Sequence, residues 1–503
     1  MYINAMKKGK MNYMQNKTLM QYFEWDLPAN GLLWQKCKVQ AAELKKSGID
    51  MVWLPPAYKG AAGNKSVGYD VYDTYDLGEF MQKNSVATKY GTKDEYLQAI
   101  DAFHDAGIEV LADVVFNHRM GADETEDVTV VETAYHDRNY VVSGEKNILA
   151  WTKFTFPGRG DKYSSLKLDS TYFTGTDWDE KNKQKGIYLF KGKNWNKATD
   201  NENNNFDYLM GADLDVTNPA TVEELDRWGK WYLDITKVDG FRLDAVKHIS
   251  HEFYENWLAS MRQYKGQSMF AVGEYWSDDL GKLHHYLNES KNAMTLFDVP
   301  LHFAFYQAST SNGHFDMGSI FCDTLVGTRP NEAVTFVDNH DTQPGQALCS
   351  YIPKWFKPIA YALILLQKEG IPCVFYGDYY GLSKSKIAPV VELKTLLKIR
   401  KAYAYGEEIK YYDHHSVVGF TRTGDEEHPN SGLAVLVTDS VAGEKRMYVG
   451  KQFAGQKFYD ALGNIETPVD IDAEGHGIFK VEGGSVSVWV TKEAYNKIWT
   501  EAK

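Results

Sequence analysis

The chain has 503 residues, of which 43% are hydrophobic and 24% are charged, a composition typical of a large folded enzyme of two or three domains. Its formal net charge of −13 argues against nucleic acid or an anionic membrane surface as a partner. Aromatic residues make up 14% of the chain, which mildly favours a carbohydrate ligand because sugar-binding clefts use aromatic faces.

Cysteine usage and the N-terminal segment bear on the cellular compartment. The four cysteines form no CxxC pair and are too few for a disulfide framework in a chain of this length. Residues 1–10 carry charge without an apolar segment behind them, so they do not resemble a secretory signal. No run of 18 apolar residues predicts a membrane span. We therefore expect a cytoplasmic protein, with the initiation codon left open by the methionines at positions 6, 11 and 14.

Strands and helices alternate over the first 117 residues. Strands are predicted at residues 19–24, 49–54 and 109–116, where short apolar runs end at polar or proline residues. Helices are predicted at residues 33–46 and 93–106, where apolar residues recur at helical spacing.

The alternation stops between residues 119 and 219. This segment is rich in Asn, Asp, Gly, Lys and Thr, with short aromatic strands and no long amphipathic helix. A structureless loop of that length is uncommon in a compact domain. We therefore expect an inserted subdomain.

The alternation then resumes with a helix predicted at residues 221–233, begun by Asn218 as the cap and Pro219 in the first turn. Five more strands bring the total to eight, at residues 238–243, 269–274, 295–297, 333–337 and 373–376. After about residue 406 the pattern changes to short alternating strands, such as residues 432–437 and 485–490, which predicts an all-β tail.

Three of the predicted strands stop abruptly at acidic residues, and these deliver Asp244, Glu274 and Asp341. Each alone is equally well explained as a salt-bridged strand end. Their recurrence favours chemistry, because the C-terminal ends of parallel barrel strands gather at one mouth. Arg242 lies two residues before Asp244 on the same face, where it favours the ionised carboxylate.

Five segments, in order along the chain, resemble the motifs of the α-amylase family. The resemblance runs from about residue 18 to residue 491, and segments such as 335–345 resemble the liquefying bacterial members in particular. The five motifs are residues 68–73, 113–118, 240–248, 273–276 and 336–341.

The resemblance implies an α/β fold, a TIM (β/α)8 barrel with an inserted irregular β-rich domain after strand 3 and a C-terminal all-β sandwich domain. The implied boundaries are residues 1–117 with 220–405 for the catalytic barrel, 118–219 for the inserted domain and 406–503 for the C-terminal domain.

The resemblance also implies a role for each carboxylate. Asp244 would be the nucleophile, Glu274 the general acid and base, and Asp341 the residue that orients sugar hydroxyls and stabilises the transition state. Glu274 must be protonated near neutral pH, and the aromatic neighbours Tyr275 and Trp276 would raise its pKa in that direction. Two carboxylates about 5–5.5 Å apart imply a covalent glycosyl-enzyme and net retention.

Other residues are expected to contact the sugar chain. Tyr69 would stack on the sugar at the scission site, and His118 and His340 would donate to its hydroxyls, since each histidine directly follows an apolar strand. Lys247 and His248 match enzymes that act on long α-1,4 chains. The expected substrate-binding set is Tyr69, His118, Arg242, Lys247, His248, Tyr275, Trp276 and His340. The implied function is endo-hydrolysis of internal α-1,4-glucosidic bonds in starch, glycogen or maltodextrin.

Three other functions remain open. A maltogenic amylase or cyclodextrinase would share these motifs and differ in its products. A non-catalytic glucan-binding barrel would have lost catalytic carboxylates, yet all three are present. A barrel hydrolase with metal-dependent catalysis would use the acidic cluster as ligands, but the motifs lack an HExxH sequence or a two-histidine pair beside the carboxylates.

The liquefying relatives hold calcium between the barrel and the inserted domain, and the resemblance places the matching ligands in this chain. They are Asn117, Asp207, Asp213 and the backbone carbonyl of His248, an all-oxygen set that suits Ca²⁺.

Relatives with extreme heat resistance add a linear cluster of further ions beside that site. Here three of the matching positions read Thr174, Asn196 and Thr217, and only Asp215 persists. With three negative charges missing, repulsion between neighbouring cations is no longer offset. We therefore expect one structural Ca²⁺ and no metal in the chemistry. We also expect a monomer, with the glucan substrate as its partner.

Overall fold

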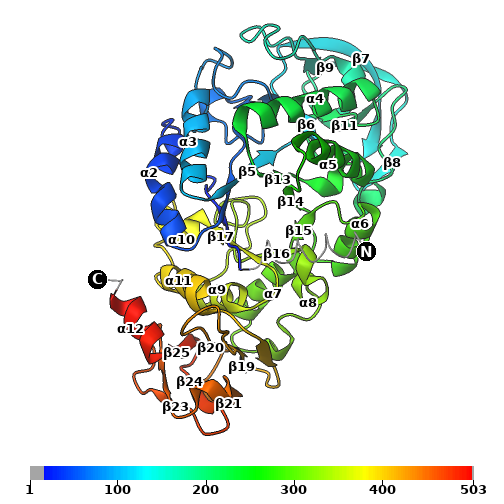
Figure 1. Ribbon diagram of the computed structural model, residues 1–503. Coiled ribbons are helices and arrows are strands. Elements are labelled where there is room, and N and C mark those ends of the chain that lie inside the picture. The colour runs from blue at the N-terminus through cyan, green and yellow to red at the C-terminus, as the bar shows by residue number, and fades with distance from the viewer. Residues whose placement is uncertain (1–15, 501–503) are drawn as a thin grey trace.

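The computed structural model describes residues 16–500, and its centre is a closed barrel of eight parallel strands (Figure 1). All eight predicted strands are present, several of them shorter than predicted. In spatial order they are β1 (Leu19–Gln21), β17 (Ile371–Phe375), β16 (Ala333–Phe336), β15 (Thr295–Phe297), β14 (Phe270–Gly273), β13 (Gly240–Leu243), β5 (Glu109–Val114) and β2 (Met51–Leu54). The expectation that residues 1–10 are not a secretory signal concerns residues outside the described range.

Helices cover the outside of the barrel (Figure 1). The predicted start at Asn218 is confirmed, because Asn218 caps the helix that begins at Pro219. The helix predicted from residue 93 also begins there, and Thr92 with Glu95 forms a capping box that was not predicted. The helices are α2 (Leu33–Lys46), α3 (Lys93–Asp105), α4 (Pro219–Thr236), α5 (His251–Lys265), α6 (Leu280–Glu289), α7 (Val299–Thr310), α8 (Leu325–Thr328), α9 (Lys357–Leu366), α10 (Tyr376–Tyr380) and α11 (Leu393–Tyr403).

The chain between β5 and α4 forms a separate seven-stranded sheet, seen at the top of Figure 1. Its own buried apolar cluster includes Val130, Ile148 and Phe173. The inserted subdomain is therefore confirmed, although β7 is longer than the short strands that were predicted. Its strands are β6 (His118–Arg119), β7 (Glu124–Ala134), β8 (Asp137–Val141), β9 (Lys146–Lys153), β10 (Phe173–Asp179), β11 (Gln184–Phe190) and β12 (Ala212–Leu214).

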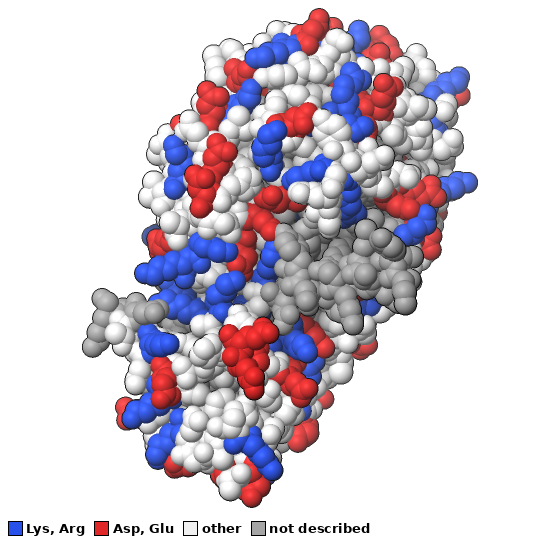
Figure 2. Space-filling view, in the orientation of Figure 1, with Lys and Arg blue, Asp and Glu red and all other residues white. Residues whose placement is uncertain are grey.

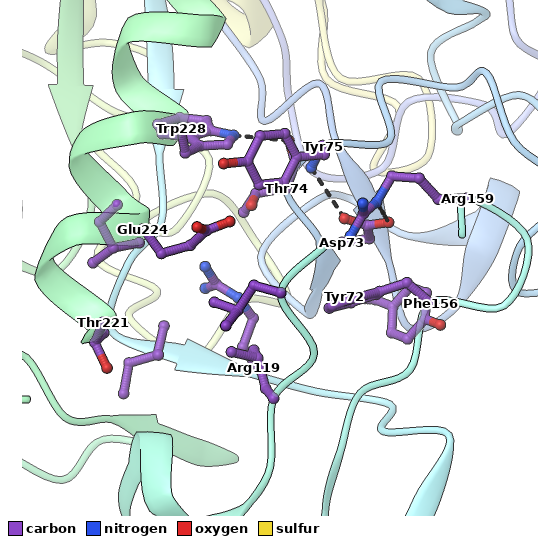
Figure 3. Close-up of a pocket in the computed structure, with 14 residues that line it drawn as sticks. Tyr72, Asp73, Thr74, Tyr75, Arg119, Phe156, Arg159, Thr221, Glu224 and Trp228 are labelled. Carbon is purple, nitrogen blue, oxygen red and sulfur yellow. Dashed lines mark hydrogen bonds and ion pairs between the residues drawn. The ribbon is translucent and has the colours of Figure 1, made fainter. Parts of the chain in front are cut away.

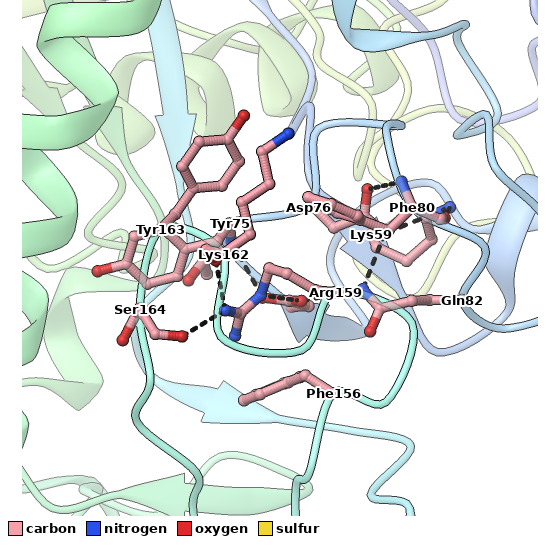
Figure 4. Close-up of polar contacts among 12 residues, drawn as sticks. Lys59, Tyr75, Asp76, Phe80, Gln82, Phe156, Arg159, Lys162, Tyr163 and Ser164 are labelled. Carbon is pink, nitrogen blue, oxygen red and sulfur yellow. Dashed lines mark hydrogen bonds and ion pairs between the residues drawn. The ribbon is translucent and has the colours of Figure 1, made fainter.

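A buried ion pair joins this subdomain to the barrel (Figure 3), and Figure 4 shows Arg159 beside Lys162 and Ser164 of its own loop. The Arg159 guanidinium donates through Nε to Asp73 Oδ2 at 2.7 Å, and both side chains are 1% exposed. Its Nη1 donates to the carbonyls of Lys162 and Ser164 at 2.8 and 2.7 Å. Asp73 ends β4 (Val71–Asp73), in the connection between β2 and α3. Arg159 therefore orders its own loop and ties that loop to the barrel.

The C-terminal part forms a six-stranded sheet and a two-stranded sheet, which confirms that it is built mainly of strands, although a final helix means that it is not all-β as predicted. Buried Val418 and Val488 of the larger sheet belong to the barrel's core cluster, whereas Leu436 and Trp489 belong to a second cluster shared with the smaller sheet. The elements are β18 (Glu408–Tyr411), β19 (Val417–Arg422), β20 (Leu433–Thr438), β21 (Gly443–Tyr448), β22 (Lys457–Asp460), β23 (Val469–Asp470), β24 (His476–Val481), β25 (Val486–Thr491) and α12 (Lys492–Thr500). The helix α12 was not predicted.

Acidic and basic side chains are interspersed over the face shown in Figure 2, without a continuous basic surface. Among the described residues, no helix is both long enough and apolar enough to cross a membrane.

Candidate active site

The barrel register brings the predicted catalytic residues together. Leu243 of β13 lies opposite Gly273 of β14, so the next residues, Asp244 and Glu274, emerge side by side at the C-terminal end of the barrel. On the other side, β13 pairs with β5 and places Arg242 opposite Asp113. Asp341 lies five residues beyond the end of β16.

Arg242 is the centre of this cluster. Its Nη1 lies 2.6 Å from Asp244 Oδ1 and 2.9 Å from Asp113 Oδ1, and its Nη2 lies 2.5 Å from Glu274 Oε2. The guanidinium is 1% exposed. One buried cation therefore contacts both predicted catalytic carboxylates. Charge-assisted hydrogen bonds of this length hold the guanidinium and the two carboxylates close together in a fixed geometry.

Burial raises the pKa of two of the predicted catalytic acids. Burial, with the neighbouring charges of Asp244 and Asp341, raises the pKa of Glu274 to about 8 despite the opposing effect of Arg242. Burial also raises the pKa of Asp341 to about 7, with Asp244 and Asp113 acting in the same direction. Glu274 is therefore protonated at neutral pH, as a general acid must be.

Aromatic rings line the cluster on one side. The Tyr69 ring stacks on His340 with a centroid distance of 5.0 Å, and on Trp25 at 5.9 Å. Tyr69 Oη donates to Asp113 Oδ2 at 2.8 Å, which fixes the ring beside the carboxylates. His340 Nε2 lies 3.4 Å from Asp341 Oδ2, and burial lowers its pKa.

His118 is buried at the start of the inserted subdomain. Its Nε2 donates to the carbonyl of Tyr69 at 2.8 Å, and burial lowers the pKa of the ring. His118 and Tyr69 therefore hold each other beside the cluster.

The residues after the catalytic strands are engaged with the inserted subdomain. Lys247 Nζ donates to Glu202 Oε2 at 2.9 Å and to the Trp276 carbonyl at 3.0 Å. His248 Nδ1 donates to the Phe206 carbonyl at 2.7 Å, and burial lowers its pKa to about 3. Lys247 thus links the loop after Asp244, the loop after Glu274 and the inserted subdomain.

Two residues of the site were not assigned a role from the sequence. Asp113 is fully buried and contacts Arg242, Tyr69 and the indole of Trp53, and the signal for it was a charge inside an otherwise apolar strand. Asp200 of the inserted subdomain accepts from the hydroxyl of Tyr275 and from Lys282 at 3.0 Å. No local pattern marked Asp200.

Three of the four predicted metal ligands, Asn117, Asp207 and Asp213, lie near one another. β12 pairs with β6 so that Asp213 lies opposite His118, next to Asn117. Asn117 Oδ1 and Asp213 Oδ2 are buried without a hydrogen-bond partner. Burial and the charge of Asp215 raise the pKa of Asp207 to about 7, and burial and Asp207 raise that of Asp213.

A cavity of about 40 Å³ lies elsewhere, between the inserted subdomain and α4 (Figure 3). Arg119, Tyr75, Glu224 and Trp228 line it, and none of the catalytic candidates does. It is therefore separate from the carboxylate cluster.

Comparison with known proteins agrees with this geometry. The description "Alpha amylase, catalytic domain" matches residues 42–411, and "Alpha-amylase C-terminal" matches residues 433–490. The chain belongs to the α-amylase family.

Its relatives within the family cover nearly the whole chain. An α-amylase of Geobacillus stearothermophilus is 55% identical over 95% of this chain and 87% of its own length. An α-amylase of Bacillus licheniformis is 52% identical over 95% and 94%. The cytoplasmic α-amylase of Escherichia coli K12 is 43% identical over 95% and 100%. In fold, the chain resembles the α-amylase of Geobacillus thermoleovorans complexed with acarbose, with a TM-score of 0.63, 18% identity, and coverage of 95% and 99%.

Proposed function

We propose that the protein hydrolyses internal α-1,4-glucosidic bonds of starch, glycogen or maltodextrin, with Asp244 as nucleophile and Glu274 as general acid and base. The observation that carries this proposal is the contact of one buried guanidinium, that of Arg242, with both carboxylates. The identity of 43–55% to α-amylases over 95% of the chain favours this function over a maltogenic or cyclodextrin-degrading relative.

The chemistry follows from the two protonation states. Protonated Glu274 gives its proton to the glycosidic oxygen while ionised Asp244 attacks the anomeric carbon and forms a glycosyl-enzyme. Glu274, now ionised, then takes a proton from a water whose oxygen attacks the anomeric carbon. The bond from that carbon to Asp244 breaks, which frees the carboxylate and releases the sugar with its configuration retained. Arg242 stabilises the anionic form of Asp244, and Asp341 orients sugar hydroxyls. Contact of both carboxylates with one guanidinium favours the short separation of retaining enzymes, about 5–5.5 Å.

The remaining predicted residues complete a cleft around the scission site. Tyr69 provides an aromatic face, His118 and His340 provide ring nitrogens, and Lys247 and His248 extend the site toward the inserted subdomain. Tyr275 and Trp276 follow Glu274 and shape its surroundings. Their expected contacts with the sugar are part of this proposal.

We also propose a structural Ca²⁺ held by Asn117, Asp207, Asp213 and the His248 carbonyl. The support is that the buried oxygens Asn117 Oδ1 and Asp213 Oδ2 have no hydrogen-bond donor, and that the buried carboxylates of Asp207 and Asp213 repel each other. Among the described residues, no three His, Cys, Asp or Glu side chains are arranged around a metal position. The proposed set has two carboxylates with an amide and a carbonyl oxygen, ligands that Ca²⁺ accepts.

A single ion is supported by the surroundings of Asp215. Its carboxylate already contacts the Lys193 ammonium, with Nζ 2.6 Å from Oδ2, and Thr217 donates to its other oxygen. A lysine therefore supplies the positive charge that a second cation would bring. The uncharged Thr174 and Asn196 line the same small hollow.

We also propose the domain boundaries stated from the sequence, because the three parts have separate sheets and buried clusters. The boundaries are residues 1–117 with 220–405, residues 118–219 and residues 406–503. A cytoplasmic location is proposed on the likeness to the cytoplasmic α-amylase of Escherichia coli. We propose a monomer with no nucleic-acid or membrane partner.

The test compares wild type with Glu274→Gln on starch and on a maltooligosaccharide blocked at its non-reducing end. Wild type should cleave both substrates, because an endo-acting enzyme needs no free end. The variant should lose about 10²–10⁴-fold in kcat, the usual contribution of a general acid. Proton NMR should show α-configured new ends first. Failure to cleave the blocked chain would exclude endo-hydrolysis, and β-configured ends would exclude retention.

A further inference from the structure

A lysine ammonium is buried between two carboxylates behind the active site. Lys357, the first residue of α9, is 1% exposed. Its Nζ lies 2.7 Å from Asp338 Oδ2 and also contacts Asp378 Oδ1. Asp338 follows β16, and Asp378 lies on α10, which directly follows β17. The lysine therefore joins the start of α9 to the ends of two barrel strands.

Hydrogen bonds continue from Asp338 to the loop that carries Asp341. Thr342 Oγ1 donates to Asp338 Oδ1 at 2.8 Å and accepts from the Asn339 N–H at 3.0 Å. Asn339 Oδ1 in turn accepts from the N–H groups of Asp341 and Thr342, both at 2.9 Å. The turn 338–342 is thus closed on itself, and Asp338 anchors it to Lys357.

The anchor depends on charge. The side chains of Asp338, Asp378 and Lys357 are no more than 2% exposed, and a single ammonium serves two carboxylates. Burial and Asp378 raise the pKa of Asp338 to about 7 even with Lys357 present. Without the ammonium the two acids would repel each other and compete for a proton. The other titratable groups around Lys357 are Tyr351, Tyr361 and His302.

We propose that Lys357 is a positioning residue for the reaction. It acts through Asp338, which fixes the turn that carries His340 and Asp341 at the active site. The proposal rests on the role given to Asp341 in the proposed function. Lys357 itself is buried behind the turn and is not expected to touch substrate.

The first experiment is Lys357→Met, which keeps an unbranched side chain one atom shorter and removes its charge. The kcat on maltooligosaccharide should fall about 10–100-fold, the effect of misplacing a catalytic group by about 1 Å, with little change in KM. The loss should deepen as pH rises from 5.5 to 8, because burial raises the pKa of Asp338, which then ionises beside a second buried carboxylate with no cation to offset the two charges. The double variant Lys357→Met/Asp378→Asn should recover part of the activity at high pH. Lys394→Met, on an exposed ion pair with Glu43, is the matched control and should match wild type.

A second experiment distinguishes an effect on the position of Asp341 from a general loss of stability. It also replaces the first experiment if Lys357→Met does not fold. Asp338→Asn and Asp378→Asn remove the same charge from the same buried cluster, but only Asp338 connects to Thr342. Asp338→Asn should therefore lose clearly more kcat than Asp378→Asn at equal loss of melting temperature. Equal kcat values for the two, or a Lys357→Met loss independent of pH, would overturn the inference. If Asp341→Asn is inactive and these variants match wild type, the inference about Lys357 fails while the proposed role of Asp341 stands. An active Asp341→Asn would instead contradict the proposed role of Asp341.

Discussion

Arg242 lies among four carboxylates. Asp113, Asp244 and Glu274 contact it directly, and its charge also acts on Asp341. One positive charge cannot balance four negative charges at low solvent exposure, so the cluster retains at least one proton near neutral pH. Burial and the neighbouring Asp244 make Glu274 the group that keeps it. With the proposed roles, the same cluster would place the nucleophile Asp244 beside a neutral acid, Glu274.

The pH dependence of kcat/KM on a maltooligosaccharide should follow Glu274. The group is active as an acid only when protonated, and its raised pKa keeps it protonated up to about pH 8. The rate should therefore fall as pH rises through about 8. Asp341→Asn removes a neighbouring negative charge, so the alkaline limb of its residual activity should move to lower pH. A limb near the ordinary glutamate pKa, or no limb up to pH 10, would contradict the assignment.

At the scale of elements, the loops between strands and helices are fixed by single polar side chains. Arg159 is the strongest case, because one guanidinium serves Asp73 and several carbonyls at the joint with the inserted subdomain. Burial raises the pKa of Asp73 even beside Arg159, so the carboxylate needs this partner to remain ionised.

Arg159→Met should destabilise the protein by about 3–5 kcal/mol, because it leaves a buried carboxylate without its cation. Calorimetry and limited proteolysis should show a lower melting temperature and earlier cleavage within residues 118–219. Asp73→Asn added to Arg159→Met should restore part of the loss. The control is Arg446→Met, whose pair with Asp472 is half exposed and contributes about 1 kcal/mol or less. Equal effects of the two arginine changes would show that the joint does not depend on Arg159.

At the scale of the whole molecule, the inserted subdomain and the barrel meet at both the catalytic loops and the proposed calcium site. Lys247 and Asp200 connect the subdomain to the loops after Asp244 and Glu274. Asn117 and Asp213 lie at the base of the same subdomain. Loss of the ion should therefore loosen the subdomain and disturb the cleft together.

Chelation should lower the melting temperature and the activity, and added Ca²⁺ should restore both, because a ligand that binds only the folded state stabilises it. Metal analysis should find about one ion per chain, as the ligand set allows. Asp213→Asn should reduce calcium binding, whereas Asp470→Asn in the C-terminal sheet should not. Two or more tightly held ions would refute the single site. An unchanged melting temperature with no calcium found would refute the site itself.

The sequence alone was sufficient for the barrel strands, the inserted subdomain and the acids at the strand ends. These features have local causes: an apolar run that stops at Asp244 or Glu274 shows the end of a strand, and Asn218–Pro219 shows the start of a helix. The C-terminal helix α12 was missed because its nine residues follow a strand-rich segment and bury only Ala494 and Ile498.

Tertiary structure decided which charges share a partner. Asp113 and Arg242 are 129 positions apart, and only the register of β5 against β13 brings them together. Asp200 reaches Tyr275 across 75 positions, and Lys357 reaches Asp338 across a loop with no regular pattern. Spacing along a chain predicts which face a side chain takes within one element, whereas contacts between elements depend on how the barrel closes. The acidic residues at the strand ends could therefore be identified from the sequence, whereas the raised pKa of Glu274 depends on the burial and the charged neighbours that the fold gives it.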